Sequence, residues 1–405
     1  MAAVTELELQ RFDYMDPTLR GERYHAAMAE VAHAGWLVEG PLGYVVLDRE
    51  GGEFFLRTKA AIFPGLKIAE LCGISDGPLY EEMVRNIINI NGDDHGRLRK
   101  LLNPALSPRA ADRHRPAMRA ILADLFRALP AKKGTDPSFA RCEFVSAFAK
   151  SYPSLVIAHL LGIPESDAPL LHDWSNWIQR QFDAQSLVED RERIEHAVVE
   201  YHAWAEELLA AKRAEPGEDL TSELLAVEGL AEVELVNLVL DVILGGIDTA
   251  QSQLSHTMRL LAEHADQWEL LRERPDELAV PAIEESLRYE PVTPFTARIT
   301  TEEVEYRGVT FPQDTVVMVS AFHANRDGVG EGFDISADRE RGRPLTFGAG
   351  IHYCVGANIA RAELQEALAF LARRVERLEL DGEPVYGTIL GIYGLDALPL
   401  RLYPA

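Results

Sequence analysis

The stretch from residue 231 to residue 263 constrains the fold more than any other part of the sequence, because it keeps helical spacing throughout and contains no proline. At about 1.5 Å per residue, one helix of this length runs on the order of 50 Å, enough to cross a domain of this size. Much of the stretch is apolar. We therefore expect a long central helix with the remaining elements packed around it.

Two adjacent glycines, Gly245 and Gly246, interrupt this helix. Each costs roughly 1 kcal/mol relative to alanine, so either another group approaches the backbone here or the local hydrogen bonding has to be loosened. Asp248 and Thr249 follow directly. A purely structural interpretation also stands: the glycines form a packing notch for a neighbouring helix, and the threonine bonds back to its own turn.

The rest of the chain is mostly helical in its spacing. Shorter helical stretches cover residues 24–35, 111–129, 148–162, 192–213 and 355–378. Residues 44–57 predict a hairpin that turns at Glu50, Gly51 and Gly52, and residues 303–320 predict a second pair of strands. Because the chain has no glycine- or proline-rich linker and no repeat, we expect a mainly α fold with a minor β portion, as one domain over residues 1–405.

The composition excludes several classes of protein. The 405 residues include 65 acidic and 40 basic side chains, for a net charge of −25, whereas a general nucleic-acid binder needs a basic surface. No stretch is long and apolar enough for a membrane span. The three cysteines are widely spaced, which fits neither a disulfide framework nor a CxxC zinc pair. We expect a soluble, cytoplasmic protein with no nucleic-acid partner and no membrane span.

One cysteine, Cys354, lies in the glycine-rich stretch FGAGIHYCVG at residues 347–356, just before an amphipathic helical stretch. Unpaired N–H groups at a helix start favour a thiolate, and the surrounding glycines let the backbone fold tightly around the sulfur. Such a sulfur could be a nucleophile, a zinc ligand or a haem-iron ligand. Further zinc ligands at suitable spacing are not evident, and neither is a base. Phe347 and His352 suit a flat apolar macrocycle with carboxylate edges.

The stretch PAIEESLRYEP at residues 281–291 predicts a helix with Pro281 in its first turn and Pro291 after its end. Glu285 and Arg288 are three residues apart and therefore lie on one face. Such pairs are common on exposed helices. Only burial would make the pair costly to break.

The stretch HGRLR places His95 and Arg99 four residues apart, so both could reach a shared anion from one helical face. Taken in order, these four stretches resemble the cytochrome P-450 haem-thiolate monooxygenases of the soluble bacterial (class I) type. FGAGIHYCVG agrees with the family's Phe-Gly-x-Gly-x-His-x-Cys-x-Gly loop at each fixed position. GGIDT resembles its oxygen-binding groove, Glu285 to Arg288 its Glu-x-x-Arg pair, and HGRLR its propionate-binding motif. The resemblance covers nearly the whole chain and implies one large haem-thiolate fold.

The resemblance implies haem b, an iron protoporphyrin IX, with Cys354 as the axial iron ligand that favours O–O cleavage. It also places Phe347, Gly356 and Gly245 at the haem. The residues that it assigns to the haem propionates are His95, Arg99, Arg298 and His352.

The resemblance further implies that Asp248 and Thr249 are catalytic, relaying protons to dioxygen, and that C–H hydroxylation is the usual outcome. Glu285, Arg288 and Arg339, the last in FDISADR, would form a buried network that supports the cysteine loop. Two positions depart from the family pattern. Ala250 stands where many relatives carry a second threonine, and the segment from 333 to 348 is longer than its shortest family version. Neither departure removes a catalytic group.

The substrate pocket is expected in segments that vary within the family. Its apolar residues would be Phe63, Leu66, Leu71, Leu240, Leu244, Val292, Phe295, Ile389 and Leu390. Ordinary core packing is the alternative for each of them, and it is favoured for Trp174 and Trp177. As a set they indicate a lipophilic small molecule such as a terpenoid, steroid, fatty acid or other natural product. Lys67, Arg180 and Gln181 could anchor a carboxylate or hydroxyl, or could lie at the surface.

The resemblance implies that electrons from NAD(P)H arrive through a reductase and an acidic ferredoxin or flavodoxin-like protein, with O2 as co-substrate. Arg109, Arg113 and Arg341 would contribute to a basic patch that steers this donor. Two alternatives stay open. One is a peroxide-using or non-oxidative haem-thiolate enzyme, and the other is a non-catalytic haem protein that binds a ligand.

Overall fold

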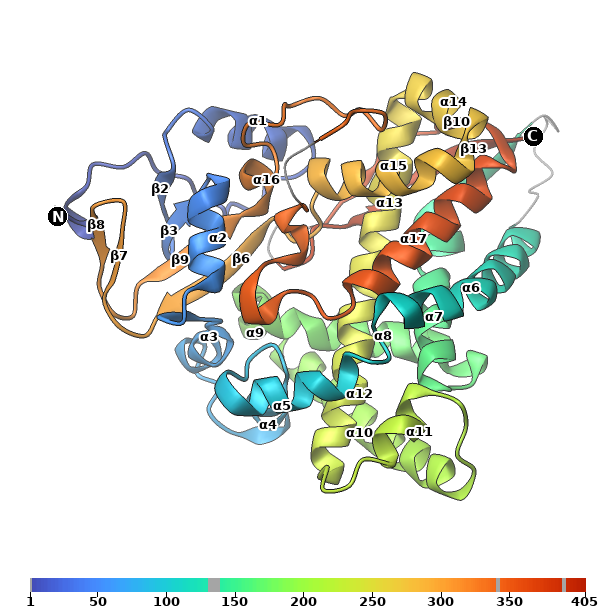
Figure 1. Ribbon diagram of the computed structural model, residues 1–405, viewed down its shortest axis with the longest axis horizontal. Coiled ribbons are helices and arrows are strands. Elements are labelled where there is room, and N and C mark those ends of the chain that lie inside the picture. The colour runs from blue at the N-terminus through green and yellow to red at the C-terminus, as the bar shows by residue number, and fades with distance from the viewer. Residues whose placement is uncertain (1, 130–138, 340–342, 388–390) are drawn as a thin grey trace. The chain divides into compact units, whose positions relative to one another are not determined.

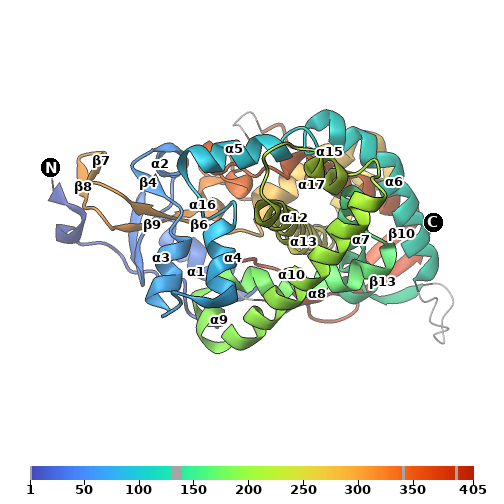
Figure 2. The same ribbon diagram turned by 90° about the horizontal axis from the view of Figure 1, so that it is seen from below.

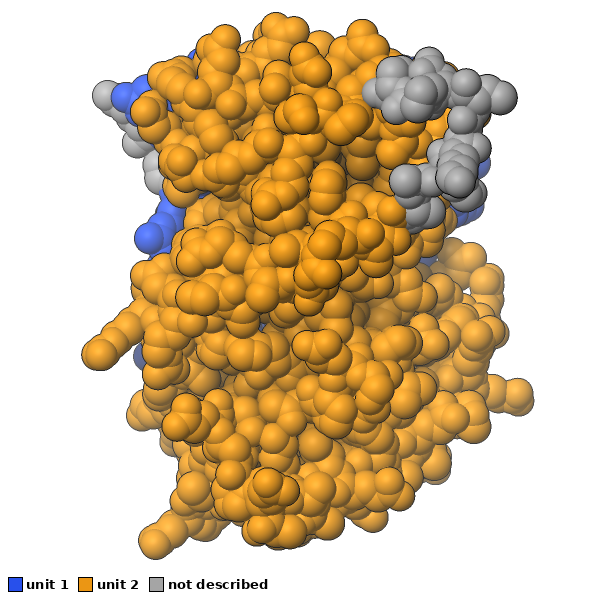
Figure 3. All heavy atoms as spheres, turned by 90° about the vertical axis from the view of Figure 1, so that its right-hand side faces the viewer, with its two compact units in different colours: residues 1–64, 284–354, 386–394 blue, residues 65–283, 355–385, 395–405 orange. Residues whose placement is uncertain are grey.

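The computed structural model describes residues 2–129, 139–339, 343–387 and 391–405 (Figure 1). Its contacts divide the chain into two compact units, which Figure 3 distinguishes by colour. Unit 1 comprises residues 1–64, 284–354 and 386–394, and unit 2 comprises residues 65–283, 355–385 and 395–405. The fold is mainly helical, which confirms the predicted fold class. The single domain over residues 1–405 stays a prediction.

The long central helix is present in unit 2 as α12 (Glu232–Gly246) and α13 (Asp248–Glu263). Only Ile247 separates them, and the hydrogen bond from its N–H to the carbonyl of Ile243 carries the helix across the junction. The helices α7 (Ser151–Leu161), α8 (Ala168–Ile178) and α10 (Arg191–Ala214) pack against α12 (Figure 2). The central helix predicted from its spacing and length is therefore confirmed.

The other helices of unit 2 precede α7, lie between α8 and α12, or follow α13 along the chain. They are α3 (Gly65–Leu71), α4 (Gly77–Arg85), α5 (Gly92–Leu102), α6 (Pro108–Ala128), α9 (Ala184–Glu189), α11 (Leu220–Leu225), α14 (Ala265–Glu273) and α17 (Ala357–Ala372). A three-stranded antiparallel sheet in the order β10-β13-β5 packs on α13 and α14. Its strands are β10 (Val375–Leu380), β13 (Pro399–Pro404) and β5 (Ala140–Glu143). The helix predicted for 355–378 is wrong after residue 372, because Val375 and Leu378 are buried in β10.

Unit 1 is built on a five-stranded sheet in the order β2-β3-β9-β6-β4. Its strands are β2 (Leu37–Gly40), β3 (Gly43–Val46), β4 (Ala61–Ile62), β6 (Phe295–Thr300) and β9 (Val316–Ser320). β3 and β9 are parallel, with Val45 opposite Met318, and the other pairs are antiparallel. A second sheet joins β1 (Ala2–Ala3), β8 (Val309–Phe311) and β7 (Val304–Tyr306). The pair of strands predicted within 303–320 is present as β7 and β8, but the segment also contains a third strand, β9, which belongs to the five-stranded sheet.

The hairpin predicted for residues 44–57 is wrong in its second half. β3 ends at Val46, and residues Arg49–Arg57 form the helix α2. Asp48 caps this helix by accepting a hydrogen bond from Gly51 N at 3.3 Å. An added Cβ at Gly52 would lie 2.9 Å from Val319 in the sheet, so the glycines that looked like turn residues allow α2 to pack closely on β9.

The helix that carries Glu285 also begins earlier than predicted. α15 covers Pro275–Tyr289, so Pro281 lies inside the helix and not in its first turn. The end of α15 before Pro291 is as predicted. α15 crosses from unit 2 into unit 1 at Glu284, which brings Glu285 and Arg288 into unit 1.

Candidate functional site

The cysteine loop of unit 1 is folded back on itself by short helical turns at 345–347 and 350–352. The N–H of Cys354 donates to the carbonyl of Phe347 at 2.9 Å, which closes the loop around the sulfur. Gly350 has a φ of 73°, and a Cβ there would lie 2.4 Å from the carbonyl oxygen of Leu56, so only glycine fits. Cys354 is half-buried and precedes the first residue of α17, Ala357, by three positions.

A buried ion-pair network lies behind this loop in unit 1. Arg288 donates to Glu285 at 2.7 and 2.8 Å, and Arg339 donates to the same carboxylate at 2.7 and 3.0 Å. Arg288 and Arg339 also both donate to the carbonyl of Gly332. Burial by itself would raise the pKa of Glu285, but the two guanidinium groups outweigh it and lower that pKa. The three predicted network residues are therefore in direct contact.

Two residues that the sequence analysis missed connect α15 to the cysteine loop. Thr346 Oγ1 donates to the carbonyl of Leu287 at 2.6 Å, and Asn325 Nδ2 donates to Thr346 Oγ1 at 3.0 Å. Asn325 Oδ1 accepts from Leu345 N at 2.7 Å. Both side chains are buried. A lone asparagine and threonine carry no motif, so only their contacts identify them.

Arg298 lies on β6 and is only 2% exposed. Its guanidinium donates to the carbonyl of Ala297 at 2.8 Å, and no carboxylate pairs with it within the described part of the chain. Burial lowers the pKa of Arg298 to about 10. A buried guanidinium without a counter-ion calls for an anionic ligand. His352 and Phe347 belong to the same unit, on the cysteine loop itself.

Unit 2 contains the predicted catalytic pair. Asp248 is buried at the start of α13, and Ser175 on α8 donates to its Oδ2 at 2.9 Å. His172 Nε2, also on α8, lies 3.7 Å from Asp248 Oδ1 and 2.9 Å from Gln251 Oε1. Burial raises the pKa of Asp248, and the nearby His172 and Ser175 reduce but do not cancel this effect. The sequence analysis missed His172 and Ser175, because residues from a distant helix leave no local signal.

The two glycines of the central helix have different surroundings. A Cβ at Gly246 would lie 2.4 Å from Ile157 Cδ1 on α7, so Gly246 is a packing notch. No described atom lies within 4 Å of the position that a Cβ would take at Gly245, so the backbone there is open to approach. Thr249 Oγ1 donates back to the carbonyl of Gly245 at 2.6 Å. The structural interpretation therefore holds for Gly246 and for the hydrogen bond of Thr249, whereas the approach of another group to Gly245 stays a prediction.

The predicted propionate pair of unit 2 lies on α5. His95 is 3% exposed, and burial first and the charge of Arg99 second lower its pKa. The effect of Arg99 on His95 indicates that the two side chains are neighbours on one helical face. Arg97, which lies between them in sequence, pairs with Glu234 on α12. Of the residues predicted to hold the cofactor, His95, Arg99 and Gly245 belong to unit 2, and Cys354, Phe347, His352 and Arg298 belong to unit 1.

The residues predicted to line the substrate pocket differ in how deeply they are buried. Leu240 and Leu244 are buried on α12, Phe63 and Leu66 are half-buried, and Leu71 is 76% exposed. Ile389 and Leu390 lie outside the described residues, as does Arg341.

In unit 1, Val292 and Phe295 are both buried. The ring of Phe295 packs against Phe12 and Tyr14, with centroid distances of 6.2 and 5.5 Å, in the core of the unit. Core packing therefore explains Phe295. In unit 2, Trp174 likewise packs on Tyr201.

Of the three predicted polar anchors, two lie at the surface. Lys67 is exposed and pairs with Glu70, and Arg180 lies over the Trp177 ring and pairs with Asp190. Gln181 alone is buried, at 1% exposure.

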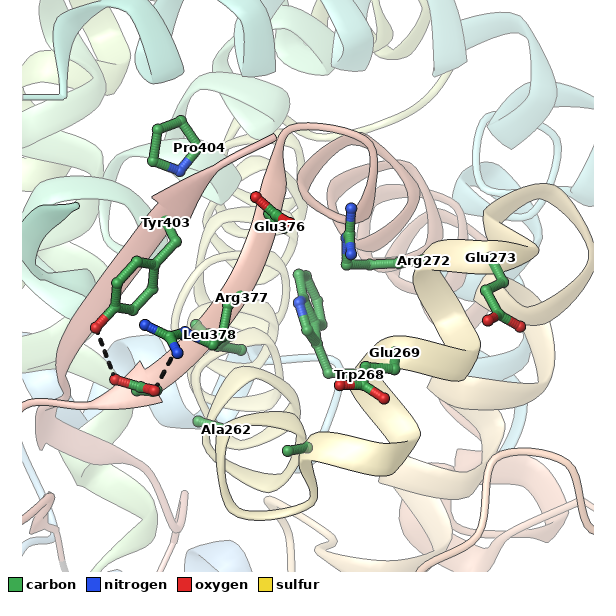
Figure 4. A pocket seen from close by; sticks show the side chains of 12 residues that line it. Ala262, Trp268, Glu269, Arg272, Glu273, Glu376, Arg377, Leu378, Tyr403 and Pro404 are labelled. Carbon is green, nitrogen blue, oxygen red and sulfur yellow. Dashed lines mark hydrogen bonds and ion pairs between the residues drawn. The ribbon is translucent and has the colours of Figure 1, made fainter. Parts of the chain in front are cut away.

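A pocket of about 650 Å³ elsewhere in unit 2 lies between α14 and the β10-β13 edge (Figure 4). Its lining includes Trp268, Arg272, Glu376 and Tyr403. None of the predicted site residues lines it. Four glutamates and two arginines line it, so its walls are largely charged and do not suit a lipophilic ligand.

Cys72, Cys142 and Cys354 form no disulfide with one another. Within the described ranges there is no group of three or more His, Cys, Asp or Glu residues that could hold a metal ion. In the same part of the chain, no helix has both the length and the apolar character needed to cross a membrane.

Comparison with known proteins gives one consistent result. The family model for cytochrome P450 matches residues 77–384. Luteothin monooxygenase from Streptomyces thioluteus is 32% identical over 97% of this chain and 96% of its own length. Erythromycin C-12 hydroxylase from Saccharopolyspora erythraea is 34% identical over 73% of this chain and 74% of its own.

Solved structures agree with this result. The crystal structure of CalO2 has a TM-score of 0.88 and 30% identity, covering 98% of this chain and all of that one. P450BioI, in complex with an acyl carrier protein ligated to hexadec-9Z-enoic acid, has a TM-score of 0.85 and 27% identity, covering 94% and 99% of the two chains.

Proposed function

Because the chain belongs to the cytochrome P450 family and is a P450 monooxygenase, we propose that it transfers one atom of O2 to a C–H bond of a lipophilic small molecule. The substrate, O2, NAD(P)H and a proton would give the hydroxylated product, water and NAD(P)+. The observation that carries this proposal is the cysteine loop, in which Cys354 is closed onto Phe347 and supported through Thr346 by the α15 network.

The residues present fit a haem. Arg298 is a buried cation that lacks an anion within the described residues, and a propionate would supply one. Cys354 would supply the thiolate that binds the haem iron, and His95, Arg99 and His352 would assist Arg298 in holding the two propionates. Gly245 and Gly356 would leave room for the macrocycle. When bound, the haem supplies the activation of O2 and the transfer of oxygen to the substrate.

The proton needed for this chemistry would be held by Asp248. Its raised pKa keeps a proton on the carboxyl to higher pH than an exposed aspartate would. Ser175 fixes Oδ2 by a hydrogen bond, while the buried Oδ1 has no hydrogen-bond partner among the described residues and lies near His172. The hydroxyl group of Thr249 donates to the Gly245 carbonyl, which leaves the lone pairs of its oxygen available to accept a hydrogen bond from another donor.

The substrate class follows from the apolar residues and the relatives. Most of the residues that the family resemblance assigns to the pocket are apolar, among them Leu240 and Leu244 on the central helix, which favours an apolar substrate. The relatives named above are a luteothin monooxygenase and an erythromycin C-12 hydroxylase, and the P450BioI structure contains an acyl chain. We infer a natural product or fatty-acid derivative as the substrate.

The electron donor would be a separate acidic ferredoxin or flavodoxin-like protein with its reductase, in the cytoplasm. Arg109 and Arg113 are exposed on α6, where they can attract such a donor. Arg115 and Arg119 on the same helix pair with Glu366 and contribute less free charge.

Reconstitution tests the proposed function. The purified protein is supplied with NADPH, a ferredoxin reductase and a ferredoxin, and a panel of lipophilic compounds is screened under labelled O2. The expected result is a product that gains one labelled oxygen atom, with matching NADPH consumption. Turnover with hydrogen peroxide and none with the reductase system would instead support the peroxide-using alternative. Tight ligand binding without any turnover would support the non-catalytic one.

A further inference from the structure

A group of buried polar side chains in unit 2 takes no part in the chemistry described above. We call it the α4–α12 polar cluster. It consists of the buried Glu82, Asn86, Asn89, Gln181 and Asn237 and of the half-buried Asp241. Glu82 lies on α4, Asn86 and Asn89 follow that helix, Gln181 lies in the turn after α8, and Asn237 and Asp241 lie one turn apart on α12. Helices α4 and α12 are in contact.

The members of the cluster are close neighbours. Asn86 Nδ2 donates to Glu82 Oε1 at 2.9 Å, and Ile87 N donates to Asp241 Oδ2 at 3.2 Å. Burial and, secondly, the charge of Glu82 raise the pKa of Asp241 well above its usual range. Burial raises the pKa of Glu82 to about 7, although Asn86 and Gln181 oppose it. Two carboxyl groups thus share one water-poor site.

Several atoms of the cluster are buried without a hydrogen-bond partner among the described residues. They are Glu82 Oε2, Asn89 Oδ1, Gln181 Oε1, Asp241 Oδ1 and both amide atoms of Asn237. Each such atom has lost its hydrogen bonds to water without replacement, and folded proteins usually contain few of them per hundred residues. Their concentration between two helices indicates that a ligand completes the site.

The chemistry of that ligand follows from the atoms that need a partner. Five of the six are oxygens, and all five only accept once Glu82 and Asp241 are ionised, as they would be beside a bound cation. The orientations of Asn89 and Gln181 are fixed because their amide nitrogens donate to the carbonyls of Met83 and Ile178. No lysine, arginine or histidine forms an ion pair with Glu82 or Asp241 in the described part of the chain. A cation with several N–H donors matches this set.

The position of the cluster ties it to the reaction. Asp241 precedes Gly245 by one helical turn, roughly 6 Å along the axis, and Asp248 by seven residues, so the three lie on nearly the same face. Asp241 is itself half-buried, although its Oδ1 has no exposed surface. A group held at Asp241 would place the atoms attached to it along the face that leads to Gly245 and Thr249.

We propose that the α4–α12 polar cluster binds a protonated amine of the substrate. This inference rests on the proposed function, since it assumes that Gly245 and Thr249 face the reacting carbon. The substrate is then a lipophilic molecule with a basic nitrogen, and the oxidised carbon lies one to two helical turns from that nitrogen. A carboxylate substrate fits less well, because Lys67 and Arg180 are paired at the surface.

Calorimetric titration of the haem-loaded enzyme with three probes of equal chain length tests the proposal. The probes are dodecylamine, dodecanol and dodecanoic acid. We expect the amine to bind at least about tenfold more tightly than either of the others, and the double variant Glu82→Gln/Asp241→Asn to lose about tenfold for the amine only. Equal affinity for the three probes, or an amine affinity that the variant leaves unchanged, would overturn the proposal.

The absorption spectrum recorded during the titration separates two modes of amine binding. Nitrogen coordination to the iron would shift the Soret band and would be indifferent to Glu82 and Asp241, and this outcome also overturns the proposal. The reduced carbon monoxide spectrum of the same samples reports on the haem site. If that spectrum is normal while amine selectivity is absent, the inference fails and the proposed function stands.

A second variant distinguishes a ligand site from a structural one. Asn237→Leu removes an amide with no partner, so it should raise the melting temperature while weakening amine binding severalfold. A lower melting temperature would show that Asn237 serves the fold and would count against the site. Asn103→Leu, which changes an exposed amide at the end of α5, is the control and should leave amine selectivity intact.

Discussion

Asp248 is the residue whose environment bears most directly on the proposed proton transfer. Its neighbour His172 lowers the pKa that burial has raised. Replacing His172 by glutamine should therefore raise the pKa of Asp248 further, so that the carboxyl keeps its proton to higher pH. We expect the alkaline fall in the rate of product formation to move to higher pH in His172→Gln.

The measurement is the pH profile of turnover for the wild type and His172→Gln, with Asp248→Asn as reference. Asp248→Asn should lower the turnover number by about 10²-fold or more, because it removes the proton-holding group. His196→Gln changes an exposed histidine on α10 and should leave the profile where it was. An unchanged profile in His172→Gln would contradict the role given to this residue.

Glu82 gives a second prediction, on stability. Its pKa is raised from 4.5 to about 7, so between these values the folded protein keeps a proton that the unfolded chain has lost. The free energy of unfolding therefore falls as pH rises through this window. A glutamine at position 82 does not ionise, so Glu82→Gln removes the cost of burying a charged carboxylate. It should stabilise the protein by up to about 3 kcal/mol at pH 8, with little effect at pH 4.5.

Urea unfolding of the wild type and Glu82→Gln at both pH values checks this expectation. Glu81→Gln is the matched control, because Glu81 is exposed on the same helix. A stabilisation that is equal at the two pH values would mean that the titration of Glu82 is not its source.

At the scale of elements, the junction of α12 and α13 offers a matched pair of substitutions. Gly245→Ala should stabilise the helix by about 1 kcal/mol, because no described atom lies near the added methyl group. Gly246→Ala should instead destabilise the protein by about 1–2 kcal/mol, because the methyl group would overlap Ile157. Thermal unfolding of the two variants measures this difference.

A double variant shows whether the overlap is the cause. Ile157→Val deletes the Cδ1 atom that lies 2.4 Å from the added Cβ, so it should cost less in the Gly246→Ala background than in the wild type. If the two substitutions are simply additive, Gly246 is not a packing notch for α7.

Elements were predictable where a long spacing pattern was present. The central helix follows from its period alone, because only a helix accommodates 33 residues with this spacing and no proline. The helix α2 was mistaken for the second strand of a hairpin because Gly51 and Gly52 look like turn residues, and only the nearby sheet explains their use in close packing. Likewise, Val375 and Leu378 continue a helical spacing but belong to a strand, because β13 pairs with them.

Site residues were predictable only where they belong to a local motif. Cys354, Glu285 and Arg288 are marked by their neighbours in sequence. His172, Ser175 and Asn325 act through contacts with residues 20 or more positions away, and such contacts leave no pattern in the sequence.

At the scale of the whole molecule, each unit contains some of the residues that the proposed function requires. Unit 1 supplies the cysteine loop with its supporting network, and unit 2 supplies the proton-holding carboxyl and the polar cluster. The fold class followed from helical content and from the order of four motifs along the chain. The substrate could not be read in the same way, because the polar cluster draws its residues from three separate segments.

The central claim is that Cys354 ligates haem iron through its thiolate. The most direct test is the absorption spectrum of the purified protein, reduced and exposed to carbon monoxide, for the wild type, Cys354→Ala and the control Cys72→Ala. We predict a strongly red-shifted Soret band in the wild type and in Cys72→Ala, and its loss in Cys354→Ala. Absence of haem from the wild type, or a red-shifted band that persists in Cys354→Ala, would contradict the assignment.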